Sequence, residues 1–71
     1  MNPVYTNKHI IVCDWFLRDV FYNPWLRENV GKEMIDWAWV WESHDSYSVY
    51  HYGICTKNTE DMLAFRLRFG V

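Results

Sequence analysis

Residues 35–41 read Ile-Asp-Trp-Ala-Trp-Val-Trp, and this stretch decides the fold. Trp37, Trp39 and Trp41 recur with a period of two, which in a β-strand places all three indole rings on one face of the sheet. We therefore expect a strand over residues 35–41 that turns its tryptophans toward the core and Val40 toward the opposite face.

A second strand is expected after the tryptophan strand. Residues 42–46 are polar and turn-forming, and residues 47–55 are rich in tyrosine and β-branched side chains. Together the two runs predict an antiparallel hairpin with a loop of about five residues. The register stays open, so Tyr50 and Tyr52 can lie on the tryptophan face or on the other face. A β-branched run over residues 9–13 predicts one more strand.

Two helices are expected between and after these strands. Residues 15–30 carry apolar side chains at helical spacing, and an Asn-Pro pair within them predicts either a kinked helix or two short ones, ending at Gly31. Residues 58–69 predict a last helix, because an asparagine can cap its start and acidic residues precede basic ones along it. Alternating phenylalanine and leucine over residues 65–69 leave a short strand as the alternative.

The aromatic content is high for so short a chain. Of the 71 residues, 51% are hydrophobic and 20% are aromatic. Each buried aromatic side chain removes about 150–250 Å² from water, so a small domain can be stable without disulfides or metal. Arg18 and Asp19 are expected to turn away from a core formed by Trp15, Phe21, Trp25, Trp37, Trp39, Trp41 and Phe65. The remaining rings exceed what such an interior can hide and predict an exposed apolar patch.

The expected order of elements is strand, helix, strand, strand, helix, in a single domain over residues 1–71. A right-handed crossover places the first and third strands side by side and both helices on one face of a three-stranded sheet. This arrangement is an α+β fold and a truncated version of the ferredoxin-like, split β-α-β plan. A short fourth strand at the C-terminus is left open. The second face of the sheet has no helix of its own.

Charge and cysteine content argue against several classes of protein. Seven basic and nine acidic residues give a net charge of −2, which argues against a nucleic-acid partner bound by phosphate neutralisation. Cys13 and Cys55 lie in apolar runs and are expected to be buried, reduced thiols, with a disulfide as the alternative. Because neither a membrane span nor a signal-peptide pattern is found, we expect a cytoplasmic protein with no membrane partner.

The residues that could carry chemistry show no spacing typical of an active or metal site. His9, His44 and His51 lack the paired spacings of metal ligands. A histidine and a cysteine four residues apart on a strand, such as His51 and Cys55, are separated by roughly 13 Å. The glycines are isolated and form no phosphate-binding loop. We therefore predict no catalytic residue, no cofactor and no metal, in a protein that is not an enzyme.

Two segments of the chain resemble a group of viral proteins. Residues 25–31 read Trp-Leu-Arg-Glu-Asn-Val-Gly and lead shortly into Ile-Asp-Trp, and residues 60–70 read Glu-Asp-Met-Leu-Ala-Phe-Arg-Leu-Arg-Phe-Gly. Together they are similar to short uncharacterised proteins of tailed bacteriophages, notably the contractile-tailed phages of marine cyanobacteria, which often end in Asp-Ala-x-x-Phe-Lys-Leu-x-Trp. Met62, Arg66 and Phe69 stand at the alanine, lysine and tryptophan positions. The resemblance implies a viral origin and a location in the host cytoplasm, and it transfers no activity and no site residue.

The excess of aromatic side chains predicts a protein that acts by protein–protein interaction. We expect a homodimer, because a two-fold pair covers an exposed face with a copy of itself, or binding to a host or phage protein as an inhibitor or adaptor. The expected contact residues on the sheet are Val40, Tyr47, Tyr50 and Tyr52, since tyrosine is a frequent hot-spot residue. The alternative function is single-stranded nucleic-acid binding, with bases stacked on the strand tyrosines.

Overall fold

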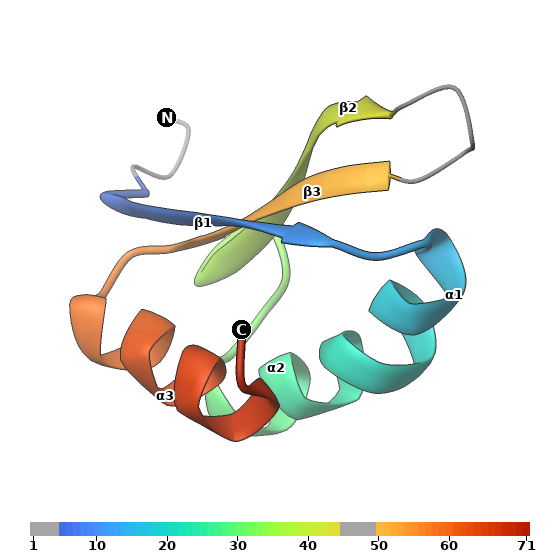
Figure 1. Ribbon diagram of the computed structural model, residues 1–71. Coiled ribbons are helices and arrows are strands. Elements are labelled where there is room, and N and C mark those ends of the chain that lie inside the picture. Colours follow the sequence, from blue (N-terminus) through green and yellow to red (C-terminus); the bar gives the residue numbers. More distant parts are fainter. Residues whose placement is uncertain (1–4, 45–49) are drawn as a thin grey trace.

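The computed structural model describes residues 5–44 and 50–71 (Figure 1). Its elements are β1 (Asn7–Val12), α1 (Trp15–Leu17), the π-helical turn η1 (Arg18–Tyr22), α2 (Asn23–Asn29), β2 (Trp37–His44), β3 (Tyr50–Thr56) and α3 (Thr59–Phe69). The chain is a small α+β domain with a three-stranded antiparallel sheet, as predicted. The expected contact residue Tyr47 lies outside the described residues.

The strands lie in the order β1-β3-β2, and β3 is antiparallel to both of its neighbours. The register pairs Tyr52 with Ile11 on one side and with Trp41 on the other. Directly paired residues of antiparallel strands share a face, so the tyrosines of β3 lie on the tryptophan face. Val40 is paired with Gly53 and lies on the opposite face. The structure thus decides the register that the sequence leaves open.

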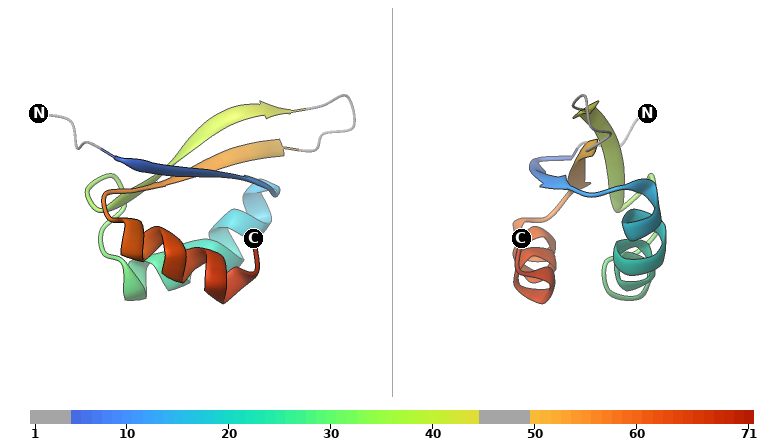
Figure 2. Two further views of the ribbon diagram at one scale, coloured as in Figure 1. Left: turned by 60° about the vertical axis from the view of Figure 1, so that its left-hand side comes forward. Right: turned by 45° about the vertical axis from the view of Figure 1, so that its right-hand side comes forward.

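Both helical segments cover the tryptophan face of the sheet (Figure 2). The helix α3 packs against β1 and β3, and the bent segment formed by α1, η1 and α2 lies beside it. No described helix covers the other side, which we call the open face. Its described residues include Lys8, Ile10, Val12, Ala38, Val40, Glu42, His51, Gly53 and Cys55.

Residues 15–29 form one bent helical segment. It begins at Asp14, whose carboxylate accepts a hydrogen bond of 2.7 Å from the backbone N–H of Leu17. Pro24 has no N–H, and its ring would collide with the carbonyl four residues earlier in a regular helix. The turn before it widens to a π-helix, in which the N–H of Asn23 donates to the carbonyl of Arg18. Of the two alternatives, the kinked helix is therefore confirmed.

An aromatic cluster joins the two helical segments to the sheet. Tyr22 and Trp25 contact Phe65 and Phe69 of α3, with ring centroids 4.8–6.1 Å apart. Trp39 of β2 joins from the sheet, 5.9 Å from Tyr22. The largest fully buried side chains of the domain are Leu26, Trp37, Ile54, Thr56 and Phe65. This burial is the main source of stability, because each fully buried large apolar side chain contributes about 1.5–3 kcal/mol.

Three of the predicted core residues lie outside the core. Trp15, Phe21 and Trp41 are exposed, whereas the guanidinium of Arg18 turns inward and lies 4.8 Å from the centroid of the Tyr52 ring. The helical prediction failed because it assumed 3.6 residues per turn. The extra residue of the π turn rotates the preceding side chains by about 100°. Trp41 is exposed at the end of the sheet where the register of β2 is irregular.

The C-terminal helix is confirmed, and the turn of the hairpin is corrected. In α3, Met62 and Phe65 are buried, and Gly70 ends the helix in the left-handed conformation with a φ of 68°. No strand follows α3 within residues 50–71, so the fourth strand is absent from this part of the chain. Residues 42–44 were expected in the turn, but β2 continues through His44, and a bulge in the strand accommodates them.

Two leucines of the bent helical segment test this account of the core. Leu26→Ala should lower the free energy of unfolding by about 2–5 kcal/mol, because Leu26 is fully buried. Leu17→Ala is the matched control and should change it by no more than about 0.5 kcal/mol, because Leu17 is exposed. Urea denaturation followed by tryptophan fluorescence measures both, and equal effects would contradict the assigned burial.

Candidate interaction surfaces

A group of exposed apolar side chains covers the outside of α1 and η1. Between 41% and 60% of each of these residues is accessible to solvent, and the only polar residues among them are Arg18 and Asp19. A surface helix usually turns its apolar side chains inward and its charged ones outward, but this segment exposes five apolar side chains and turns Arg18 inward. We call this group the aromatic helix surface, and it consists of Trp15, Phe16, Leu17, Val20 and Phe21.

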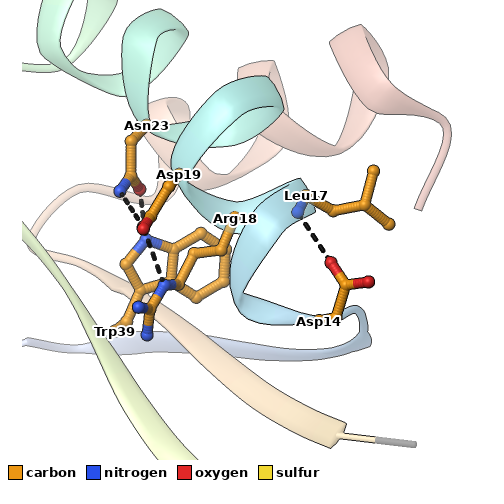
Figure 3. Close-up of polar contacts among 6 residues, drawn as sticks. All are labelled: Asp14, Leu17, Arg18, Asp19, Asn23 and Trp39. Carbon is orange, nitrogen blue, oxygen red and sulfur yellow. Dashed lines mark hydrogen bonds and ion pairs between the residues drawn. The ribbon is translucent and has the colours of Figure 1, made fainter.

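The two charged residues of this segment are held by contacts within the domain (Figure 3). Nε of Arg18 lies 3.3 Å from Oδ1 of Asp19, and the same oxygen accepts a hydrogen bond of 3.2 Å from the side-chain amide of Asn23. Oδ1 of Asn23 in turn accepts a hydrogen bond of 2.7 Å from the indole N–H of Trp39. Arg18 also packs on Tyr52 in a cation–π contact. Arg18 therefore turns toward the sheet, contrary to the prediction, whereas the carboxylate of Asp19 stays about half exposed, as predicted.

Asn23 is the central residue of this network. It is buried, and both ends of its amide are used, the oxygen by Trp39 and the nitrogen by Asp19. The indole N–H of Trp37 likewise donates to the carbonyl of Gly31 at 2.9 Å. Because buried N–H groups require a partner, these two bonds allow the tryptophans to pack inward. They also fix the bent helical segment relative to β2.

The open face of the sheet is aliphatic rather than aromatic. An ion pair of 2.7 Å between Lys8 of β1 and Glu42 of β2 crosses it above Gly53 of the central strand. A Cβ atom at Gly53 would lie 3.1 Å from atoms of both charged side chains, so glycine leaves the space that the pair occupies. The exposed apolar residues on this face are Ile10, Val12 and Val40.

The contact residues predicted from the sequence do not form a single patch. Val40 lies on the open face, whereas Tyr52 lies on the helix-covered face, 6.2 Å from the ring of Trp39. Tyr50 lies beside Tyr52, with ring centroids 6.3 Å apart. Tyr47 is outside the described residues. A binding role for Val40, Tyr50 and Tyr52 stays a prediction, but these side chains cannot all meet one flat partner surface.

Sequence reasoning missed the aromatic helix surface. It assigned Trp15 and Phe21 to the core because they belong to a run of apolar residues that recurs at helical spacing. The available signal was Pro24, since a proline after several helical residues distorts the preceding turn and rotates the side chains before it. Because of this distortion, the spacing of residues 15–21 does not determine which of their side chains face the core.

Both cysteines are buried free thiols, as predicted. Cys13 belongs to the core, and Cys55 lies on the open face, so they occupy opposite sides of the sheet. Burial raises the pKa of Cys13 to about 11 and also raises the pKa of Cys55. Such thiols are poor nucleophiles, because the reactive form is the thiolate.

The described residues contain no group of three or more side chains that could hold a metal ion. Within the same residues, none of the helices has the length and apolar character needed to span a bilayer.

A double-mutant cycle tests the link between Asn23 and Trp39. Asn23→Ala should lower the free energy of unfolding by about 1–3 kcal/mol, because it leaves the indole N–H without an acceptor. The same change in a Trp39→Phe background should have a smaller effect, because no indole N–H remains to be satisfied. Chemical denaturation of the four proteins measures the coupling, and additive effects would contradict it.

The raised pKa of Cys13 predicts a loss of stability at alkaline pH. In the unfolded chain the thiol ionises near its ordinary value of 9.0, and in the folded chain near 11. Above pH 9 the unfolded state therefore binds fewer protons, and the free energy of unfolding falls until the pH reaches about 11. Denaturation at pH 8–11 should show a shallower decrease for Cys13→Ala than for the wild type. Identical slopes would show that burial does not suppress this ionisation.

Comparison with protein-family models, curated proteins and solved structures gives no match to this chain. The resemblance to proteins of tailed bacteriophages is therefore still a prediction from the sequence. The functional argument depends on the surfaces described above.

Proposed function

We propose that this protein is a small binding module that acts by protein–protein interaction and catalyses no reaction. The observation that carries the proposal is the exposure of five apolar side chains on α1 and η1, while Arg18 of the same segment packs inward on Tyr52. Contiguous apolar surface of this kind is uncommon on soluble monomers and usually marks an interaction site.

The composition and the rigidity of the aromatic helix surface both support this role. Trp15, Phe16 and Phe21 are large side chains of the kind that dominate binding energy when a partner buries them. The network around Asn23 fixes the helical segment that presents them. A pre-ordered surface binds more tightly, because less conformational freedom is lost on association.

The finer assignments of fold and origin also belong to this proposal. The strand order β1-β3-β2 with both helical segments on one face is compatible with a truncated ferredoxin-like plan. We further propose, from the resemblance to phage proteins, that the chain is a phage accessory protein working in the host cytoplasm. The partner is then a phage or host protein that it inhibits or links to another component.

Single-stranded nucleic-acid binding receives less support from the geometry. Tyr52 lies on the helix-covered face, where Arg18 and Trp39 contact its ring, so a base would have to displace them. The net charge of −2 also gives little attraction for phosphates. Protein binding is the better proposal.

A double variant of the aromatic helix surface tests the function. Phe16→Ser combined with Val20→Ser should leave the fold intact, because both residues are exposed, but should abolish most binding of an apolar fluorescent dye. The same variant should lose proteins that the wild type captures from a lysate. Fluorescence titration and quantitative mass spectrometry measure these two effects.

The matched control is Ile10→Ser combined with Val12→Ser, which removes exposed apolar side chains from the open face instead. This control should keep the captured proteins. If the helix variant and the control retain the same proteins in equal amounts, α1 and η1 are not the binding surface and the proposal is wrong.

A further inference from the structure

The strand β1 is an edge of the sheet, and its outward backbone groups are regular. The N–H of Cys13 donates to the carbonyl of Tyr50 at 3.0 Å, which continues the pairing of β1 with β3. In an antiparallel ladder, hydrogen-bonded and non-bonded residues alternate. The N–H and C=O groups of Lys8, Ile10 and Val12 therefore point away from β3, toward an edge that no described strand pairs with.

The other edge of the sheet, on β2, is interrupted. Glu33 forms a bridge with Trp37, and the N–H of Met34 donates to the carbonyl of Trp37 at 2.7 Å. Farther along β2, the register shifts between Trp41 and Ser43. Covered ends and bulges are the usual means by which proteins block edge pairing. In contrast, β1 pairs with β3 without a shift over all of its residues.

The edge of β1 also lacks an outward charge. Lysine on an edge strand normally discourages pairing with another chain. Here the ammonium group of Lys8 reaches across the open face to Glu42 at 2.7 Å, so its charge is paired within the domain. The other two residues with outward backbone groups, Ile10 and Val12, are exposed and apolar. The strand is therefore unprotected along its length.

We propose that the edge of β1 binds a second copy of this chain in an antiparallel, two-fold pair centred on Ile10. Ile10 then lies opposite Ile10 of the second copy, and Lys8 lies opposite Val12. In this register all three residues with outward backbone groups find partners, and the two Lys8 side chains stay apart. The inference goes beyond the proposed function, because it uses a surface separate from α1 and η1.

The neighbouring helix supports the same two-fold axis. Leu63 and Leu67 of α3 are 53% and 85% exposed and lie one turn apart, on the same side of the helix. Phe65 faces the bent helical segment. Burial lowers the pKa of His9 on β1, and charge repulsion from the nearby Arg66 lowers it further, so Arg66 is on the β1 side of the helix. At 100° per residue, both leucines lie beyond Arg66, on the side away from Phe65. They therefore flank the β1 edge.

The spacing of the elements fits a helix–helix contact across this axis. Neighbouring strands in a sheet are about 4.8 Å apart. The helix α3 packs under both β1 and β3, so its axis projects onto the sheet about 2.4 Å from β1, toward β3. The two-fold axis lies about 2.4 Å from β1 in the opposite direction, midway between the two paired β1 strands. The two α3 helices would then be separated by about 10 Å, close to the 8–10 Å at which helices pack. A second copy thus covers the strand edge and both leucines at once, which an isolated peptide strand would not do.

A stable interface usually takes about 800 Å² from each partner, and a single strand edge supplies only part of this area. The leucines of α3 extend the contact, and the open faces of the two copies join into one continuous surface. A homodimer therefore satisfies the strand edge and the helix flank with groups that the chain itself provides.

Sedimentation equilibrium and chemical cross-linking test the proposal. The wild type at micromolar concentration should have about twice the monomer mass of 8.7 kDa. Ile10→Cys should form an intermolecular disulfide on mild oxidation, because directly paired Cα atoms are about 5.5 Å apart. Val40→Cys is the control, exposed on the same face but on another strand, and should not cross-link. A monomeric wild type, or cross-linking of Val40→Cys but not of Ile10→Cys, would overturn the proposal.

Two further variants separate this interface from the aromatic helix surface. Ile10→Pro should give a folded monomer by circular dichroism, because the N–H it removes is not bonded to β3. Val20→Glu changes an equally exposed apolar residue on η1 and should remain a dimer. A dimer that survives Ile10→Pro, or that is lost with Val20→Glu, would place the contact elsewhere. The proposed function is measured separately, by capture with the Phe16 and Val20 variant, so either proposal can fail alone.

Discussion

One hydrogen bond, from the indole N–H of Trp39 to the side-chain oxygen of Asn23, links the sheet to the bent helical segment at 2.7 Å. It lies next to Pro24, where the helix leaves its regular period, so the position of the π turn and the position of the sheet are set together. The amide of Asn23 also holds Asp19, which contacts Arg18. This chain of contacts holds the guanidinium of Arg18 over Tyr52, on the side of the segment that faces the sheet, while five apolar residues of α1 and η1 are exposed.

On the open face, too, charged side chains contact each other within the domain, and the residues next to them are apolar and exposed. Lys8 and Glu42 pair across Gly53, and neither charge then protects the edge of β1. Exposed ion pairs contribute little to stability, with a median of about 0–1 kcal/mol. The main effect of the pair is therefore on the character of the surface. In both places charged groups are satisfied within the domain, and the surface next to them is left apolar.

The parts of this fold that the sequence predicts depend on a regular period. The tryptophans of β2 follow a period of two, and Met62 and Phe65 of α3 follow the helical period. Both elements are confirmed, and Trp37, Met62 and Phe65 are buried, whereas Trp41 is exposed. The parts that it does not predict depend on a local departure from the period. The π turn before Pro24 departs from the regular helix that the apolar run over residues 15–30 predicts, and Trp15 and Phe21 are exposed. The bulge of β2 lets the strand continue through residues that are typical of a turn. The register stayed open because the predicted strand over residues 47–55 carries apolar or aromatic side chains on both faces.

The order of the strands in the sheet is determined by how the chain connects them. The positions of the exposed aromatic residues are determined by how much space the interior offers. A right-handed crossover and a hairpin suffice to place β3 between β1 and β2. The interior then accepts rings only where two helical segments and the sheet converge, around Tyr22, Trp39 and Phe65. Side chains beyond this point cannot be covered by so few elements, whatever their hydrophobicity. An excess of aromatic residues in a chain of 71 residues must therefore appear at the ends of its elements, and α1 lies at such an end.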